Sequence, residues 1–163
     1  MVDPDARLAR ARAAAASVLD PEIPALTIAE LGMLRDVTLD NDTVVATITP
    51  SYSGCPATQP IAHDVAAALA EAGFPDAQVR LVLAPAWSSD WITEAGRRKL
   101  AEAGIAPPEQ GAARLRLFGQ SRPACPRCGS ADTEQISMFG ATPCKALHRC
   151  LTCREPFEAF KCH

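Results

Sequence analysis

Cys125-Pro126-Arg127-Cys128 and Cys150-Leu151-Thr152-Cys153 are the stretches that decide the fold of the carboxyl-terminal part of this chain. Each is a C-x-x-C pair, and 21 residues separate the two pairs. Because a C-x-x-C turn points two thiolates at one centre, two such turns complete a tetrahedral site of four sulfurs, as in a structural zinc ribbon. Such a site is closed and leaves no open position for a substrate. We therefore expect it to stabilise the fold and not to perform chemistry.

The small size of this module supports a bound metal. The 39 residues from Cys125 onward are too few to fold on apolar burial alone. We therefore expect Zn²⁺ to supply much of their folding free energy. Cys144 does not fit as an alternative ligand. Five residues separate it from Cys150, so the two cannot form a C-x-x-C turn. The predicted zinc ligands are Cys125, Cys128, Cys150 and Cys153.

Two further cysteines flank the ribbon, Cys144 and Cys162, and His163 follows the second of them. In a three-stranded ribbon their strands would be neighbours, which predicts a redox pair or a secondary metal site that His163 joins. The alternative is that both cysteines are small apolar side chains filling a minimal core. The sequence leaves both interpretations open.

Charge and composition limit the function classes. The chain has 163 residues, a formal net charge of −3, 48% hydrophobic residues and 5% aromatic residues. From Cys125 onward, five Lys and Arg stand against four Asp and Glu, and bound thiolates make that region more negative still. A ribbon that reads DNA or RNA is normally more basic, so we expect no nucleic-acid partner.

The sequence also bears on the compartment. No stretch of 18 apolar residues is present, and the first five residues are acidic where a signal peptide is basic. We therefore expect a cytoplasmic protein without a membrane partner. In a reducing compartment, the seven cysteines are interpreted as metal ligands and reactive thiols before disulfides.

Apolar periodicity and turn residues predict an α+β fold: a small mixed or antiparallel sheet with packed helices, followed by the zinc ribbon. The predicted domains are an α/β domain over 1–105, a linker over 106–123 and the ribbon over 124–163. The expected elements are a helix from Pro4 capped by Asp3 and ending near Asp20, strands over 33–39 and 44–49, a helix ended by Gly73, a strand over 79–83 and a helix over 88–103.

The second stretch with chemical interest is Thr49-Pro50-Ser51-Tyr52-Ser53-Gly54-Cys55-Pro56. Pro56 suits the first turn of the following helix, which places Cys55 at or near the N-cap. The free N–H groups and the positive end of the helix dipole favour a thiolate there, so we expect a lowered pKa. The alternative is a buried structural cysteine that fills a small gap.

Three motifs in the first half resemble one family. Asp20-Pro21-Glu22-Ile23-Pro24, then Leu31-Gly32-Met33, then the Cys55 stretch are similar to the signature of the SufT-like iron–sulfur assembly domain family. The resemblance covers about residues 4 to 85. The chain departs from the pattern at Ser51, where threonine is common, but the hydroxyl group is kept.

A second resemblance spans nearly the whole chain. Pro85 to Thr93, Gly104 to Pro108, Cys144 to Leu147 and Phe160 to His163 resemble the PaaD (also PaaJ) subunit family of the ring-1,2-phenylacetyl-CoA epoxidase system. In that system a di-iron oxygenase and a flavin/iron–sulfur reductase perform the epoxidation. The resemblance implies that this chain is an accessory protein that helps to install or maintain the iron–sulfur cluster of the reductase.

The resemblance also implies site residues and partners. Cys55 becomes a candidate contact for a transient iron or iron–sulfur cluster or for a client thiol, with Glu22 and Ser53 in the same surface region. The alternative for Glu22 is a solvated side chain after Pro21. The expected partners are the oxygenase and reductase subunits. The oligomeric state stays open, with a dimer as one option.

Catalysis by the chain alone is not expected. The sequence lacks a pair of Glu-x-x-His motifs for a di-iron site, a G-x-G-x-x-G loop and a ferredoxin-type cysteine pattern. His63 is expected to be solvated, and for His148 a surface position is favoured over a place beside the zinc ligands.

Two other functions are weighed against the accessory role: a stoichiometric structural subunit of the epoxidase, and a zinc-ribbon nucleic-acid adaptor, which the charge disfavours.

Overall fold

The computed structural model describes residues 3–111 and 122–161. The chain divides into two compact units, Met1–Trp87 and Ser88–His163. The fold is α+β with a carboxyl-terminal ribbon, which confirms the predicted class. Within the described residues, no helix combines the length and the apolar character needed to cross a membrane.

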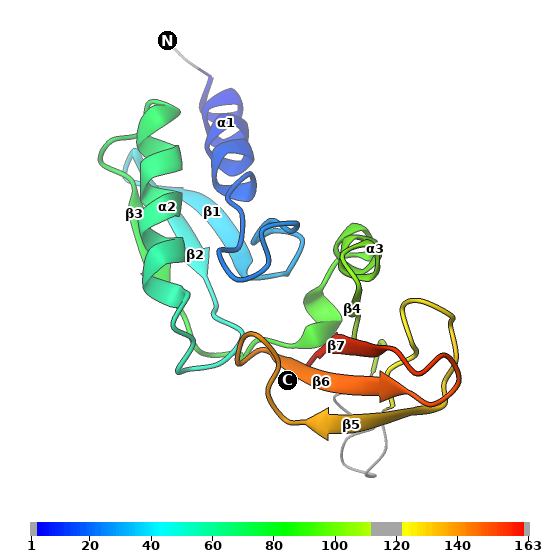
Figure 1. Ribbon diagram of the computed structural model, residues 1–163. Helices are drawn as coiled ribbons and strands as arrows, with labels where there is room; N and C mark the ends of the chain where they lie inside the picture. The colour runs from blue at the N-terminus through cyan, green and yellow to red at the C-terminus, as the bar shows by residue number, and fades with distance from the viewer. Residues whose placement is uncertain (1–2, 112–121, 162–163) are drawn as a thin grey trace. The chain divides into compact units, whose positions relative to one another are not determined.

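The first unit is a three-stranded sheet with two helices. Its strand order is β1-β2-β3, with β1 antiparallel and β3 parallel to the central strand β2. Helices α1 and α2 contact each other and pack against the sheet (Figure 1). The elements are α1 (Pro4–Ala16), β1 (Leu34–Asp40), β2 (Thr43–Ile48), α2 (Thr58–Glu71) and β3 (Gln78–Leu81).

Local chemistry explains where these elements begin and end. The Oδ1 atom of Asp3 accepts the N–H of Asp5, and Pro4 occupies the first turn of α1, as the sequence predicted. Asn41 and Asp42 both adopt positive φ angles, 45° and 69°, which is the conformation of a tight two-residue hairpin between β1 and β2. Glycine at position 73, with φ 92°, ends α2.

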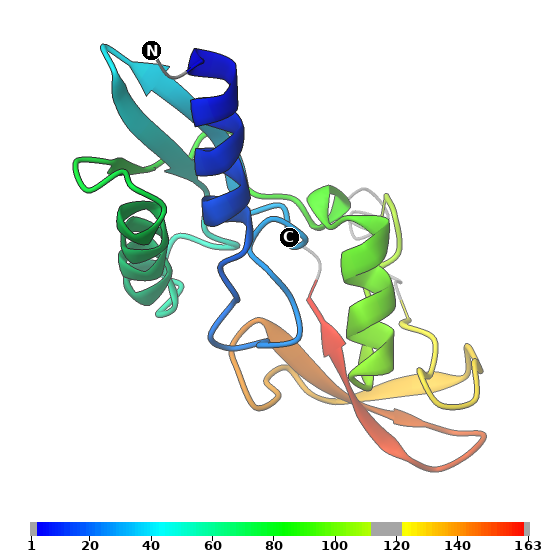
Figure 2. The ribbon, with the colours of Figure 1, turned by 90° about the horizontal axis from the view of Figure 1, so that it is seen from above.

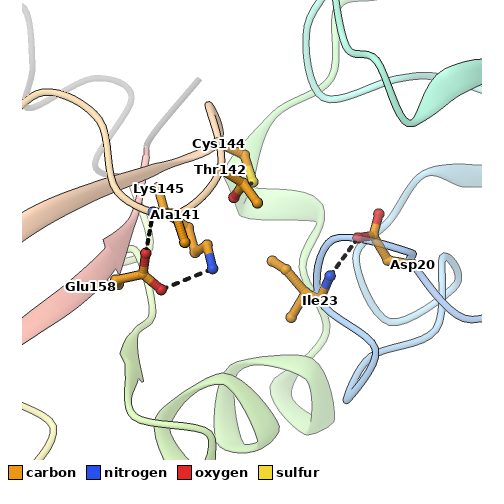
Figure 3. A network of polar contacts seen from close by, with 7 residues as sticks. All are labelled: Asp20, Ile23, Ala141, Thr142, Cys144, Lys145 and Glu158. Carbon is orange, nitrogen blue, oxygen red and sulfur yellow. Dashed lines mark hydrogen bonds and ion pairs between the residues drawn. The ribbon is translucent and has the colours of Figure 1, made fainter.

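A buried carboxylate organises the segment that follows α1. The helix ends at Ala16, earlier than the predicted end near Asp20, and Asp20 takes a different role. Its Oδ1 atom accepts the N–H groups of Glu22 and Ile23, each at 2.8 Å. Figure 3 shows the bond from Ile23. Its own N–H donates to the carbonyl of Leu26 at 2.9 Å. Asp20 therefore holds the turn that carries Glu22.

The second unit contains a four-stranded sheet in the order β4-β7-β6-β5. Figure 2 shows its carboxyl-terminal strands in yellow, orange and red. The parallel pairing of β4 with β7 joins residues of the predicted first domain and linker to the ribbon sheet. This division differs from the predicted boundary at residue 105, and part of the predicted linker, 112–121, lies outside the described residues. The elements are η1 (Ser89–Trp91), α3 (Glu94–Glu102), β4 (Ile105–Ala106), β5 (Thr133–Ser137), β6 (Lys145–Cys150) and β7 (Pro156–Phe160).

The single helix predicted over 88–103 is wrong. Ser88 accepts the N–H of Asp90 and starts a short 3-10 turn, and Ile92 is extended, with ψ 126°. Thr93 then caps α3 by accepting the N–H of Gly96 at 3.0 Å. Two hydroxyl side chains that bind backbone N–H groups therefore divide the stretch into two helical pieces.

A partly buried ion pair connects β6 and β7. Lys145 Nζ lies 2.8 Å from Glu158 Oε2, with side chains 7% and 25% exposed, and Glu158 Oε1 accepts the N–H of Ala141 at 2.5 Å (Figure 3). Burial by itself raises the pKa of the Glu158 carboxyl. The hydrogen bonds from Lys145 and Ala141 outweigh this effect, so its pKa lies below the ordinary 4.5. The contribution of the pair to stability is therefore fully present at neutral pH.

We predict that Glu158→Gln lowers the free energy of unfolding at neutral pH by about 1–2 kcal/mol, because Lys145 keeps its charge in a buried position without a carboxylate. Urea unfolding of the metal-loaded chain, followed by circular dichroism, measures the change. The matched control is Glu134→Gln, which breaks the solvent-exposed pair with Arg149 and is expected to cost less than about 0.5 kcal/mol. Equal effects of the two variants would contradict the role given to the buried pair.

Candidate metal centre and thiol pocket

The four predicted ligands of the ribbon converge on one point. The Sγ atoms of Cys125, Cys128, Cys150 and Cys153 all lie within 4.8 Å of one another. Cys125 Sγ is 3.8 Å from Cys153 Sγ, and Cys128 Sγ is 3.6 Å from Cys150 Sγ. Four sulfurs at about 2.3 Å around a tetrahedral Zn²⁺ stand about 3.8 Å apart, so the donor set and its spacing fit such an ion.

The two C-x-x-C turns share one backbone design. In the first, Cys125 receives the N–H of Gly129 on its carbonyl and donates its own N–H to the carbonyl of Ser130. In the second, Cys150 makes the same two bonds with the N–H of Arg154 and the carbonyl of Glu155. Gly129 and Arg154 both have positive φ angles, 74° and 67°. This repeated turn aims each pair of sulfurs at the common centre.

A backbone N–H group also prepares one of the sulfurs for metal binding. The N–H of Cys153 points at Cys150 Sγ, 3.5 Å away. This hydrogen bond is the main reason that the pKa of Cys150 falls to about 6. A hydroxyl contact of 2.8 Å between Ser130 and Thr152 links the two turns directly. The arrangement therefore favours a thiolate at Cys150. For Cys153 the backbone of Glu155 lowers the pKa, but burial and the neighbouring sulfurs outweigh it and raise the pKa to about 12. Because cysteine binds a metal as the thiolate, a bound cation is needed to hold all four sulfurs in that form.

The remaining Cys and His residues of the ribbon do not join the four-sulfur cluster among the residues that the structure describes. Cys144 is buried, its Sγ lies 3.1 Å from the hydroxyl of Thr142, and its carbonyl accepts the N–H of Lys161. Cys162 and His163, the other members of the predicted secondary site, lie outside the described residues. The expected surface position of His148 is wrong, since the side chain is buried and stacks on Phe157 with ring centroids 5.7 Å apart. Burial lowers its pKa.

Cys55 lies in the loop between β2 and α2 and lines a cavity of about 430 Å³. Its side chain is buried, with 9% of the residue exposed. The exposed apolar residues Leu81 and Leu83 line the same cavity, with Ser53 and Thr58. The thiol is thus neither sealed in the core nor freely exposed: it stands at the wall of an open pocket.

The predicted lowered pKa of Cys55 is wrong, although the residue does lie near the N-cap of α2. The N-cap of α2 is Ala57, and the helix begins at Thr58. Burial raises the pKa of the Cys55 thiol, a hydrogen bond with the backbone of Ala57 opposes this, and the negative charge of Glu22 raises it further. The helix dipole therefore does not govern the thiol; desolvation does, and the resting group is a neutral thiol.

Sequence reasoning named Glu22 but missed the residue that places it. Glu22 is near enough to act electrostatically on Cys55, although 33 positions separate them in the chain. Asp20, which was considered only as a helix end, fixes the turn that presents Glu22. The sequence did contain a signal for this role. In Asp20-Pro21-Glu22-Ile23, the side chain of the Asp that starts the turn is suited to accept the backbone N–H groups of the residues after the Pro.

Comparisons with known proteins also divide the chain into two parts. Residues 8–81 match the family described as "Iron-sulfur cluster assembly protein", and residues 110–161 match the "PaaD zinc beta ribbon domain". Over 143 residues the chain is 50% identical to an Escherichia coli (strain K12) protein provisionally named as a subunit of 1,2-phenylacetyl-CoA epoxidase. That match covers 88% of this chain and 86% of the relative. The chain belongs to the PaaD family.

A solved structure supports the fold of the first unit. The domain of unknown function DUF59 from Bacillus anthracis is 31% identical, with a TM-score of 0.53, over 60% of this chain and 93% of its own length. Both resemblances that the motifs indicated are thereby confirmed. In this PaaD-family chain, Cys55 falls within the part that matches the assembly family, and the four clustered cysteines fall within the part that matches the ribbon family.

We predict that Cys150→Ser removes the metal from the ribbon and unfolds it, because three thiolates no longer close the site and a module of this size depends on its ion. Metal analysis should fall from about one ion per chain to nearly none. The control is Cys144→Ser, a buried cysteine outside the cluster, which should keep its full metal content. Retention of metal and protease resistance in Cys150→Ser would contradict the four-sulfur site.

We predict that Glu22→Gln accelerates alkylation of Cys55 by iodoacetamide near pH 8, because removal of the carboxylate charge lowers the thiol pKa and increases the thiolate fraction. The pH midpoint of the reaction should move down. A metal-loaded Cys144→Ser, Cys162→Ser background isolates the signal of Cys55. Glu71→Gln, at an exposed position on α2, is the control and should leave the rate unchanged; an unchanged rate in Glu22→Gln would contradict the coupling.

Proposed function

We propose that this chain is a non-catalytic accessory protein of a phenylacetyl-CoA epoxidase system, and that it matures or maintains the iron–sulfur cluster of the reductase component. The family membership and the name of the Escherichia coli relative support the link to the epoxidase. The match to the iron–sulfur cluster assembly family supports the maturation role. The cluster is a cargo of the chain in this proposal, not a resident cofactor.

The observation that carries the proposal is the position of Cys55. The thiol lines an open pocket between a strand and a helix, inside the unit that matches the assembly family. Hydroxyl groups of Ser51 and Thr58 interact with the sulfur and favour its ionised form. A single sulfur with adjacent hydroxyls and an open approach suits a transient contact with iron or with a client cysteine.

The negative charge of Glu22 disfavours a free thiolate at Cys55 and favours a bound cation. Glu22 and a Cys55 thiolate are like charges, which is why Glu22 raises the thiol pKa. The same two negative groups attract an iron cation, whose charge offsets the repulsion. The thiol therefore stays protonated and unreactive at rest and becomes a ligand only when a cation arrives. Ser53, at the exposed rim of the cavity, belongs to the same contact region.

In this proposal the ribbon is a scaffold. We infer that Cys125, Cys128, Cys150 and Cys153 hold Zn²⁺, since a closed set of four thiolates at tetrahedral spacing fits this ion and leaves no coordination position for a substrate. The ion would contribute folding free energy to the second unit. The chain's chemistry with iron would then depend on the first unit alone.

A second candidate function is a stoichiometric structural subunit of the epoxidase. The word subunit in the name of the Escherichia coli relative favours it. This function requires stable co-elution with the oxygenase and no dependence of cluster content on Cys55. The two functions therefore differ in one measurable property, the iron content of the reductase.

We predict that a reductase produced together with Cys55→Ser contains at least about threefold less iron and acid-labile sulfide than one produced with the unaltered chain, because serine is a far poorer ligand for iron–sulfur clusters. Iron and sulfide are measured on the purified reductase. Thermal unfolding of Cys55→Ser verifies that the fold is intact.

The matched control is Cys144→Ser, which removes a buried thiol from the other unit and should leave the reductase cluster unchanged. Normal cluster content with Cys55→Ser would overturn the maturation role. If the unaltered chain and Cys55→Ser also co-elute with the oxygenase in a fixed ratio, the structural-subunit function is supported instead.

A further inference from the structure

The cavity at Cys55 adjoins a free edge of the first sheet. In the order β1-β2-β3, strand β3 pairs with β2 on one side, and no described strand pairs with its other side. Leu81, the last residue of β3, lines the cavity together with Cys55, and so does Leu83 just beyond the strand. The open edge and the thiol pocket therefore meet at the carboxyl end of β3.

The backbone of β3 directs hydrogen-bonding groups to this free side. Val82 donates its N–H to the carbonyl of Ile48 in β2 at 3.0 Å. Successive residues of a strand point their backbone groups to opposite sides, so those of Leu81 and Val79 point away from β2. An unpaired row of N–H and C=O groups binds another extended backbone, as in the strand addition that many peptide-binding proteins use.

The opposite edge of the sheet, on β1, is blocked. Asp36 Oδ1 accepts the N–H of Val37 at 2.8 Å, and Arg12 Nε donates to the carbonyl of Val37 at 3.2 Å. The register of β1 also shifts between Leu34 and Asp36. Side-chain contacts and irregularities of this sort prevent pairing with another chain. Among the described residues, no side-chain contact of this kind is seen on β3, so the two edges differ.

Two exposed leucines make the pocket side of the open edge suited to an apolar side chain. Leu81 is 41% exposed and Leu83 is 58% exposed, whereas Ile48, the partner of Leu81 in β2, is buried. Among the described residues of the first unit, Leu19 is the one other large apolar residue exposed to this degree. Exposed apolar area concentrated at a pocket marks a binding surface, because covering it is favourable.

We propose that the free edge of β3 binds an extended segment of the client protein, and that this segment carries a large apolar residue two positions from the cysteine that meets Cys55. This inference rests on the proposed function. Alternate side chains of an added strand point to the same face, about 6–7 Å apart. One of them packs on Leu81 and Leu83 while the other reaches the thiol. The backbone bonds hold the segment, and the pocket selects which client cysteine is served.

The test uses the full, metal-loaded chain under reducing conditions and two peptides of equal composition. In acetyl-Thr-Leu-Thr-Cys-Thr-Lys-Thr-amide the leucine and the cysteine are two positions apart. In acetyl-Thr-Thr-Leu-Cys-Thr-Lys-Thr-amide they are adjacent, so they face opposite sides of a strand. Only the first peptide should bind saturably. Its binding should slow amide hydrogen exchange at Val79 and Leu81 and leave it unaltered at Arg80 and Val82, which already face β2.

Leu83→Ser should weaken binding of the first peptide at least about threefold, because it removes apolar contact area beyond the end of β3. The matched control is Ile136→Ser, which changes an exposed apolar side chain on β5 in the other unit and should have no effect. Produced together with the reductase, Leu83→Ser should also lower the iron content of the reductase, and Ile136→Ser should not.

No saturable binding, equal binding of the two peptides, or unchanged binding in folded Leu83→Ser would each overturn the docking mode. Slow exchange at Val79 and Leu81 that rises with chain concentration in the absence of peptide would overturn it too, by showing that a second copy occupies the edge. If Cys55→Ser depletes the reductase of iron but Leu83→Ser does not, the docking mode is wrong and the maturation role stands. Normal iron with Cys55→Ser overturns the maturation role itself.

Discussion

The convergence of four cysteine sulfurs within 4.8 Å is the constraint on which the second unit depends. A short, four-stranded sheet with few large buried side chains has little apolar area to offset the entropy of chain ordering. The two cysteine turns bring their hydrogen-bonded loops together at one point, and the sheet β4-β7-β6-β5 continues from there. The turn at Cys150 and Cys153 joins β6 to β7, so the cluster lies where these two paired strands meet.

In the first unit, one buried thiol, that of Cys55, lies at the wall of a cavity. The core of this unit is built from ordinary apolar packing of α1 and α2 on a mixed sheet. The buried carboxylate of Asp20 fixes the turn that carries Glu22. The loop between β2 and α2 carries Cys55. Charge from Glu22 and burial keep Cys55 protonated. The two units thus use cysteine in different ways: a closed cluster of four sulfurs, and a single neutral thiol at a pocket wall.

This contrast also explains why a cysteine count alone is a poor guide to function. Cys144 and Cys125 are both buried, yet of the two only Cys125 belongs to the cluster, because its turn aims the sulfur at three others. Cys55 belongs to no such group among the described residues, and its setting is determined by hydroxyls and a carboxylate. Geometry, not residue type, separates the structural sulfurs from the candidate functional one.

The sequence by itself determined the four clustered cysteines, the cap and start of α1 and the α+β class, because each rests on local spacing or turn chemistry. Only the tertiary structure decided the state of Cys55, since desolvation and the charge of a residue 33 positions away outweigh the nearby helix end. It also decided that His148 is buried and that β4 joins the ribbon sheet. Those outcomes depend on contacts between distant segments, which no local pattern encodes.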